Sequence, residues 1–558
     1  MGWKGTSSLE QRQQQTPFAP VVANQYLNQL GFVETINRSV EWDSKQCKVS
    51  PGLLAKSVVL STFADTRTPL YRIWKTFYGT DIAMLFGEGL AAEDFSDDAI
   101  ARTLDKISAF GTETLFSRIS LAGLAAYDVP VDRLHCDTTS ITLAGAYEEC
   151  EEEDYQGLSV CHGYSKDHRP DLKQVVLGKV VNEHGIPLVS LPLDGNTSDT
   201  EFNRLALNIL TETYGERLEK MVYIADSKLI NLPTLKIFTE RPTPVQFISR
   251  CPDAFYRKLA VRVKRLAFES DGNWVSQGAI GEGKQCAQYQ TQGFREWVDG
   301  SVYRLIVVKT SAGRERVDKI LAKDRNSLEK ALALLADRPF ACEADARKAA
   351  QLFDQEHKNS CYEWEWNLDS TTVEKRSRGN PGKTPKPPIT ETTWRVQGKI
   401  FREKTDKCDL LRYKDESFVL ITNVAEEAMS DREVLRQYKE QHRVEVQFRT
   451  LKEPALAAQI FLKKPGRIDA LLMLLSVALL IRGLMQFRVR QQLAGYSQTP
   501  RIGMNRAKLT QPTAEMLLIL FKSYVLIREG PDYRCECQSN EDLKAFPIWM
   551  DLLGIQFE

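Results

Sequence analysis

Three acidic residues occupy segments from which their side chains could reach one site. Helical spacing in residues 438–452 puts four polar side chains within roughly a 60° sector, at about 100° per residue. They belong to Tyr438, Gln441, Glu445 and Lys452, beside an apolar stripe of Val444, Phe448 and Leu451. One face of such a helix can dock on a core while the adjacent face presents polar groups. A solvated amphipathic helix has the same periodicity, so the spacing alone is compatible with both.

The other two acids follow or interrupt apolar, extended segments. Asp226 comes directly after the strand-like residues 221–225, and strand ends are where side chains leave a sheet and reach a cleft. Asp137 lies inside the strand-like residues 134–143. A carboxylate in such a run must be paired, metal-bound or at a sheet edge, because an isolated buried carboxylate is too costly. Taken singly, each aspartate is more simply explained as a cap or turn residue.

Carboxylates gathered at one place are suited to metal-assisted phosphoryl transfer. Hard divalent ions such as Mg²⁺ prefer oxygen ligands. Two such ions about 3.5 to 4 Å apart stabilise the attacking and leaving oxygens of an in-line displacement. This chemistry explains why three acids would be needed together.

The order of the acids and the spacing around the last one resemble a known family. An Asp, an Asp and a Glu on strand, strand and helix, with a Tyr-x2-Arg-x3-Glu-x6-Lys signature, are typical of DDE transposases of bacterial insertion sequences. These enzymes have a ribonuclease-H-like core with an insertion before the Glu. Tyr438, Glu445 and Lys452 keep the intervals of the signature, whereas Gln441 takes the Arg position and Arg443 lies nearby. Similarity to one subgroup extends to residues 85–89, 94–98, 163–173 and 195–199.

The resemblance implies roles for these residues. Asp137, Asp226 and Glu445 would be the catalytic residues and would bind two Mg²⁺ or Mn²⁺ ions, with Asp137 bridging both ions. Lys452 and Tyr438 would bind phosphates near the scissile bond, because an ammonium and a phenol supply donors there. Further candidates for DNA contact are Gln441, Arg443 and Arg449. The implied reaction is hydrolysis at the element's ends, followed by attack of the freed 3′-hydroxyl on target DNA.

The implied partner is double-stranded DNA, comprising the terminal inverted repeats and the target, bound by a dimer. The net charge of the chain does not indicate DNA binding, because 74 Lys and Arg residues balance 74 Asp and Glu residues. Any DNA-binding surface must therefore be a local basic patch. Residues 431–467 hold nine Lys and Arg against five acids, which favours this stretch for the transposon end. The basic stretch 375–386, in a Pro- and Gly-rich frame, is explained equally well as a DNA contact or as a solvated loop.

The composition is typical of a multidomain globular protein of the cytosol. A chain of 558 residues suggests roughly three or four units. Its 11 scattered cysteines favour reduced thiols, and Cys535-x-Cys537 has the wrong spacing for a structural zinc site. The longest apolar run, 470–481, is shorter than the roughly 20 residues that span a bilayer, which predicts a buried helix. We therefore expect a cytoplasmic, nucleoid-associated protein that does not contact a membrane.

The pattern and the resemblance together predict an α/β protein. The resemblance implies a ribonuclease-H-like core, a mixed five-stranded sheet flanked by helices, and we expect an inserted α+β domain and an all-helical amino-terminal domain beside it. The expected parts are a disordered tail (1–20), a helical DNA-binding domain (21–127), the core (128–250 and 409–495), the insertion (251–408) and a carboxy-terminal helical region (496–558). The 218 residues between Asp226 and Glu445 far exceed what one crossover needs, so they require an inserted unit.

Local patterns refine this division. They predict strands at 134–143, 221–225, 303–308 and 418–422, a hairpin of 174–181 and 186–191, and helices at 202–210, 314–357, 431–493 and 513–527. Ser96 is predicted to cap a helix that begins after it.

Two other functions fit the same residues. A nuclease with the same core would hydrolyse DNA without joining ends, and product analysis separates the two. A catalytically silent DNA-binding protein descended from a transposase is the other alternative. The presence of all three acids and of Lys452 argues against it.

Overall fold

The computed structural model describes residues 14–64, 68–151, 157–240, 244–270, 272–281, 286–375, 389–452, 462–503, 507–530, 532–537 and 539–555. The chain divides into two compact units. Unit 1 comprises residues 1–249 and 437–558, and unit 2 comprises residues 250–436. Residues 376–386 of the basic stretch lie outside the described ranges.

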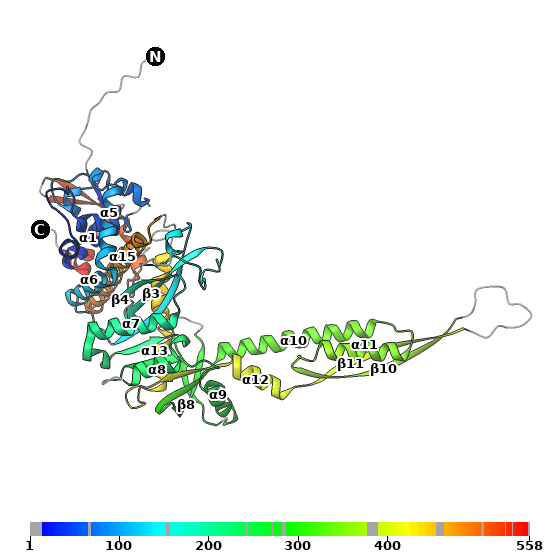
Figure 1. Cartoon of the computed structure of the whole chain (residues 1–558). Helices are drawn as coiled ribbons and strands as arrows, with labels where there is room; N and C mark the ends of the chain where they lie inside the picture. The colour runs from blue at the N-terminus through cyan, green and yellow to red at the C-terminus, as the bar shows by residue number, and fades with distance from the viewer. Residues whose placement is uncertain are drawn as a thin grey trace, which may run out of the picture. The chain divides into compact units, whose positions relative to one another are not determined.

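Five neighbouring strands of a mixed sheet lie in unit 1, except that the last residue of the fifth belongs to unit 2. They are β2 (Arg133–Leu143), β3 (Lys173–Asn182), β4 (Pro187–Leu193), β5 (Val222–Ala225) and β6 (Gln246–Arg250). Figure 1 labels two of them, β3 and β4. Their order is β4-β3-β2-β5-β6; β2, β3 and β4 are antiparallel neighbours, and β2, β5 and β6 are parallel ones. The mixed α/β class is confirmed, as are the predicted strands at 134–143 and 221–225 and the predicted hairpin.

Two glycines shape the antiparallel hairpin. The turn between β3 and β4 uses Gly185 at φ 75°, a conformation that favours glycine. Asn182 Oδ1 closes this turn by accepting hydrogen bonds from the backbone N–H groups two and four residues on, at 3.0 and 2.9 Å. A Cβ on Gly178 would lie 2.2 Å from the ring of Phe202. The missing side chain therefore lets helix α7 (Asp199–Tyr214) pack closely on the sheet.

Helices cover both faces of these strands. α7 covers the face on which Gly178 lies. Because successive residues of a strand point to opposite faces, the next residue, Lys179, faces the other side. Two helices pack on that side. α14 (His442–Lys452) forms an apolar cluster with Val181, and α15 (Pro465–Gly495) is joined to the sheet by a 2.7 Å hydrogen bond between Ser476 and Ser190. Unit 1 also contains α8 (Leu232–Thr239) and α17 (Asn540–Leu553).

The amino-terminal segment is helical, as predicted, and packs as part of unit 1. Its helices are α1 (Phe18–Gln29), α2 (Phe32–Ser39), α3 (Pro51–Ser61), α4 (Ile82–Phe86), α5 (Asp97–Phe110) and α6 (Thr112–Ala126). Ser96 caps α5 by accepting a hydrogen bond from the N–H three residues on (3.3 Å), as predicted. Arg467 of α15 donates two 2.7 Å hydrogen bonds to Asp105, and Thr112 donates one of 2.8 Å to Asp469. These contacts tie α5 and α6 to α15 within one unit.

Helix α15 is buried, as the apolar run predicted. The whole helix is long and apolar enough to cross a membrane, whereas the apolar run 470–481 is too short to indicate this. Every residue from Ala470 to Met485 is buried inside unit 1. Arg482 donates to the carbonyl oxygen of Thr62 (3.1 Å) and lies over the ring of Phe63. The helix is therefore a core element of this unit.

Both ends of the described chain differ from the sequence prediction. The expected tail, 1–20, includes β1 (Gln15–Pro17), which pairs with β13 (Tyr524–Glu529), and the start of α1 at Phe18. The expected helix 513–527 ends with α16 (Ala514–Phe521), and β13 pairs with β14 (Asp532–Cys537), so the carboxy-terminal region is not all-helical. The ring of Phe18 lies 5.2 Å from that of Phe521 and 5.8 Å from that of Tyr524. This packing joins residues hundreds of positions apart, which no local pattern reveals.

Unit 2 contains four further sheet strands and an arm. The strands, in the order β12-β9-β8-β7, are β12 (Ser417–Thr422), β9 (Ser301–Thr310), β8 (Gln288–Val298) and β7 (Val275–Ala279). In the arm, α10 (Ser311–Asp337) and α11 (Glu343–Glu356) lie along the hairpin of β10 (Tyr362–Lys375) and β11 (Ile389–Glu403) (Figure 1). The remaining helices are α9 (Leu259–Glu269) and α12 (Thr405–Asp415), and the boundary to unit 1 falls within α13 (Asp431–Lys439). The predicted strands 303–308 and 418–422 are confirmed, and the predicted helix 314–357 is present as two helices.

Candidate functional site

Asp137 and Asp226 come directly after the last residues at which the parallel strands β2 and β5 pair with each other. β2 and β5 are in register from Arg133 opposite Val222 to Cys136 opposite Ala225. The next residue on each strand is an aspartate. Asp226 also caps the turn after β5, because its Oδ1 accepts a hydrogen bond from the backbone N–H two residues on (3.0 Å). The two carboxylates therefore stand side by side where β5 ends.

Burial and like charges raise the pKa of both carboxyls. Burial, the largest cause, raises the pKa of Asp137 to about 6 and raises that of Asp226 above its ordinary value. The Asp226 carboxylate further raises the pKa of Asp137, and Asp199 raises the pKa of both. Two contacts lower the pKa of Asp137: the Lys166 ammonium, 3.6 Å from Oδ1, and the Thr138 N–H, at 2.8 Å. A cation bound here would relieve the repulsion between the carboxylates.

Lys166 and Asp199, which the spacing of the sequence does not single out, complete this cluster. Lys166 Nζ donates to the carbonyl oxygen of Thr138 (2.9 Å) and to its Oγ1 (2.7 Å), and it lies 3.2 Å from Asp199 Oδ1. The Thr138 hydroxyl also donates to Asp199, the first residue of α7. Lys166 and Asp199 fall in the stretches 163–173 and 195–199, which resemble the transposase subgroup. This resemblance is the sequence feature that could have identified both residues as part of the site.

Buried basic groups share the face of Asp137. Lys179 lies directly opposite Asp137 in the β2–β3 ladder; its side chain is fully buried, and its Nζ has no hydrogen-bond partner among the described residues. Burial lowers the pKa of Lys179 to about 7. His135 is also buried, and burial, then the charge of Arg443, lowers its pKa to about 3. A lysine among the valines of β3 was visible in the sequence, but its burial was not.

Residues 438–452 do not form one continuous helix. α13 ends at Lys439 and α14 begins at His442. Between them the N–H of Gln441 bonds the carbonyl oxygen of Tyr438, three residues back (3.2 Å). Such bonds wind the chain more tightly than those of an α-helix, so the 100° spacing is lost there. Residues 438–452 therefore lack the uninterrupted helical spacing expected of them, and the sector shared by Tyr438, Gln441 and Glu445 stays a prediction.

Glu445 lies on an exposed flank of α14. Val444 and Phe448 cluster with Val181 of β3, while Gln447 donates to the carbonyl oxygen of Gly185 (2.7 Å). Gln447 points nearly opposite Glu445 around the helix, so these contacts fix the rotation of α14. Within the described ranges, no group of three or more His, Cys, Asp or Glu is arranged to hold a metal. The structure does not bring Glu445 into the aspartate pair, and its role as third ligand stays a prediction.

The remaining candidates for DNA contact lie along α14, in the turn before it and, for Tyr438, near the end of α13. Lys452 forms an ion pair with Asp167 (2.6 Å), in which both side chains are about one-third exposed (31% and 32%). Arg443 lies 3.5 Å from Glu440, Arg449 is exposed, and Gln441 and Tyr438 are partly buried. Lys452 is thus placed beside Asp167, the neighbour in sequence of Lys166.

The paired aspartates fit a hard divalent cation. Their donors are carboxylate oxygens, which suit Mg²⁺ or Mn²⁺ better than a soft metal. The pKa values of both carboxyls are raised, and the ammonium of Lys166 lies 3.6 Å from Asp137 Oδ1. One cation held between Asp137 and Asp226 is consistent with these observations.

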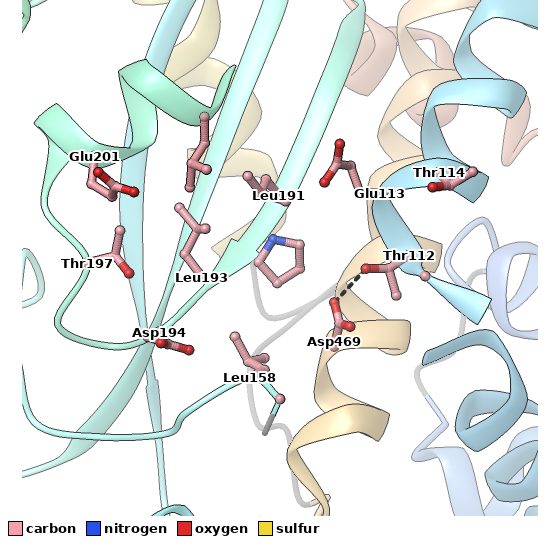
Figure 2. Close-up of a pocket in the computed structure, with 14 residues that line it drawn as sticks. Thr112, Glu113, Thr114, Leu158, Leu191, Leu193, Asp194, Thr197, Glu201 and Asp469 are labelled. Carbon is pink, nitrogen blue, oxygen red and sulfur yellow. Dashed lines mark hydrogen bonds between the residues drawn. The ribbon is translucent and has the colours of Figure 1, made fainter. Parts of the chain in front are cut away.

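A separate depression of about 560 Å³ lies elsewhere in unit 1 (Figure 2). Figure 2 shows Asp469 of α15 directed at Thr112, with which it shares a 2.8 Å hydrogen bond, and burial raises the pKa of Asp469 to about 6. Glu113, Asp194 and Glu201 also line the depression. None of the residues predicted from the sequence to act on DNA or metal lines it.

Comparisons with known proteins give limited likeness. A family model described as a domain of unknown function, DUF4277, matches residues 14–121. No curated protein matches the sequence. Among solved structures, a cryo-EM structure of a piggyBac transposase synaptic complex with hairpin DNA is 8% identical, with a TM-score of 0.39, and the match covers 91% of this chain and 82% of that one. A TM-score of this size is too low to identify a shared fold.

Proposed function

We propose that the chain is a DDE transposase of a bacterial insertion sequence, which cuts DNA at the element's ends and joins them to target DNA. The observation that carries the proposal is that Asp137, within β2, and Asp226, directly after β5, lie side by side where the parallel pairing of the two strands ends. The strand order β4-β3-β2-β5-β6 supports a ribonuclease-H-like core. The helix that carries Glu445 and Lys452 packs on β3 of the same sheet.

The residues divide into metal-binding and DNA-binding groups. Asp137 and Asp226 would hold Mg²⁺ or Mn²⁺, and Glu445 is the proposed third ligand of a two-ion site. When bound, the ions would stabilise the attacking and leaving oxygens of the phosphoryl displacement. Lys452 and Tyr438 would bind phosphates beside the scissile bond, with Gln441, Arg443 and Arg449 as further contacts.

The partners belong to the same proposal. The chain would bind the terminal inverted repeats and the target as double-stranded DNA, acting as a dimer on the nucleoid. The exposed Arg449 and the partly exposed Lys452 at the end of α14 support a local basic contact, which a neutral chain requires.

The DNA products distinguish the proposed function from its alternatives. Purified protein would be incubated with Mn²⁺, a linear duplex that carries the DNA flanking its own gene, and a circular target plasmid. A transposase yields duplexes cut at the element's ends and products joined to the plasmid. A nuclease yields cut duplex alone, and a silent DNA-binding protein yields shifted but intact duplex. Either of these two results would overturn the proposal.

A further inference from the structure

Two neighbouring residues of opposite charge contact the two groups that the proposed reaction needs free. Lys166 lies 3.6 Å from Asp137, a proposed metal ligand, and Asp167 lies 2.6 Å from Lys452, a proposed phosphate contact. The first contact puts a cation on the carboxylate, and the second puts an anion on the ammonium. Each residue thus carries the charge of the ligand that its partner would bind.

The segment that presents these residues is built into the fold. The backbone N–H of Lys166 donates to Ser140 Oγ of β2 (2.8 Å), and Gln174 donates to the carbonyl oxygen of Tyr164 (3.2 Å). A Cβ on Gly163 would lie 2.0 Å from the carbonyl oxygen of Gly195, so the segment starts in close contact with the turn before α7. The backbone N–H of His168 donates to the carbonyl oxygen of Ser165 (3.3 Å), so residues 165–168 form a turn, and His168 itself has a φ of 57°. The two contacts are therefore set by the course of the backbone.

Both ion pairs are placed so that a ligand can displace them. The Lys166 and Asp137 side chains are 32% and 23% exposed, and those of Asp167 and Lys452 are about as accessible. An ion pair between partly exposed side chains, such as Asp167 and Lys452, is weak, and the 3.6 Å contact of Lys166 with Asp137 is longer than a hydrogen bond. A divalent ion carries twice the charge of the Lys166 ammonium, so it competes well for Asp137. DNA presents a row of phosphates, so it competes well with the single carboxylate of Asp167 for Lys452.

We infer that residues 166 and 167 keep the site closed in the free protein, with Lys166 standing in for a metal ion on Asp137 and Asp167 standing in for a DNA phosphate on Lys452. The inference rests on the proposed function and adds its regulation. Because the two residues are adjacent, displacing one disturbs the other. Metal binding and DNA binding therefore assist one another, each by the same factor.

The first test concerns DNA and needs no metal. The affinity of a short, fluorescein-labelled duplex of random sequence would be measured by anisotropy in excess chelator for Asp167→Asn, Lys452→Met and the double variant. Asp167→Asn should bind about two- to fivefold more tightly than wild type, the effect of freeing one partly exposed charge. This gain should vanish in the Lys452→Met background, whereas a general charge effect would persist there. Unchanged or weaker binding by Asp167→Asn, or an equal gain in both backgrounds, would overturn the inference.

The second test concerns the metal and needs no DNA. Mn²⁺ affinity would be measured by calorimetry at mildly alkaline pH for Lys166→Met, Lys166→Arg and Lys48→Met. Lys48 serves as the control because it pairs with Asp94, outside the acidic cluster (2.7 Å). Lys166→Met should bind Mn²⁺ about tenfold more tightly, because a cation beside Asp137 no longer competes. Lys166→Arg, which keeps the charge, and Lys48→Met should match wild type.

A further variant separates failure of the inference from failure of the proposed function. If Asp137→Asn lowers Mn²⁺ affinity while Lys166→Met leaves it unchanged, the metal site stands and the inference is wrong. If Asp137→Asn leaves Mn²⁺ affinity unchanged, the metal site itself is wrong, and the inference falls with it. Should Lys166→Met not fold, the wild-type protein gives the answer. Its affinity for the same duplex should rise about fivefold with saturating Mn²⁺ at matched ionic strength, and no rise would overturn the inference.

Discussion

Lys179 lies directly opposite Asp137 on the neighbouring strand, with its Nζ fully buried and without a hydrogen-bond partner among the described residues. Burying an ammonium in this way is unfavourable, and the pKa of Lys179 falls to about 7. The side chain therefore changes its protonation state near neutral pH, on the face that carries the proposed metal ligand. This arrangement has a consequence for stability that can be measured.

Lys179→Met should stabilise unit 1 and remove part of its pH dependence. The pKa of Lys179 is about 7 in the folded protein and about 10.4 when unfolded, so between these values the unfolded state holds one more proton. The wild-type free energy of unfolding should therefore rise by about 1.4 kcal/mol per pH unit across that window relative to the variant. Hydrogen exchange of β3 amides at about pH 6 and about pH 9 measures this difference. Equal pH dependence in the two proteins would show that the ammonium is hydrated.

The amino-terminal helices should be required for folding of the core. Removing residues 1–127 uncovers the face of α15 that packs on α5 and α6, so the shortened chain should aggregate. A milder change makes the same comparison: Leu104→Ala, at a buried position of α5, should cost about 2–5 kcal/mol. Its control, Leu121→Ala on exposed α6 surface, should cost well under 1 kcal/mol, or about the value for ordinary surface changes. Urea unfolding of the variants and size-exclusion chromatography of the deletion would check both. A monomeric, cooperatively unfolding 128–558 fragment would show that the core folds alone.

The sequence could predict features that depend on neighbouring residues, but not contacts between segments that are far apart in the chain. The strands around Asp137 and Asp226 were predictable, because apolar, β-branched runs are local signals. The convergence of Lys166 and Asp199 on Asp137 was not, since it depends on how the segment before β3 and the turn before α7 return to the sheet. The break before α14 was also missed, because apolar spacing is nearly the same on either side of it.

Lys452→Ala should weaken duplex binding and reduce its salt dependence. One lost phosphate contact lowers the slope of log affinity against log salt by up to about 0.9. The change should fall below this limit, because Asp167 partly neutralises Lys452 in the free protein. Anisotropy titrations over a range of salt concentrations, with Lys48→Ala as control, provide the slope. A slope equal to that of wild type would mean that Lys452 does not contact the DNA backbone.

The dependence of DNA cleavage on metal and on three carboxylates tests the proposed function most directly. Cleavage of a duplex that carries the DNA flanking the gene would be timed with Mn²⁺ and with excess chelator for wild type, Asp137→Asn, Asp226→Asn and Glu445→Gln. Glu201→Gln supplies the same change of charge at an exposed pair with Arg204, and it should cut like wild type. We predict that wild type cuts only with Mn²⁺ and that each of the three variants binds the duplex but cuts several orders of magnitude more slowly. Cutting by Glu445→Gln at the wild-type rate would remove Glu445 from the site, and cutting by wild type in excess chelator would contradict the metal-dependent mechanism itself.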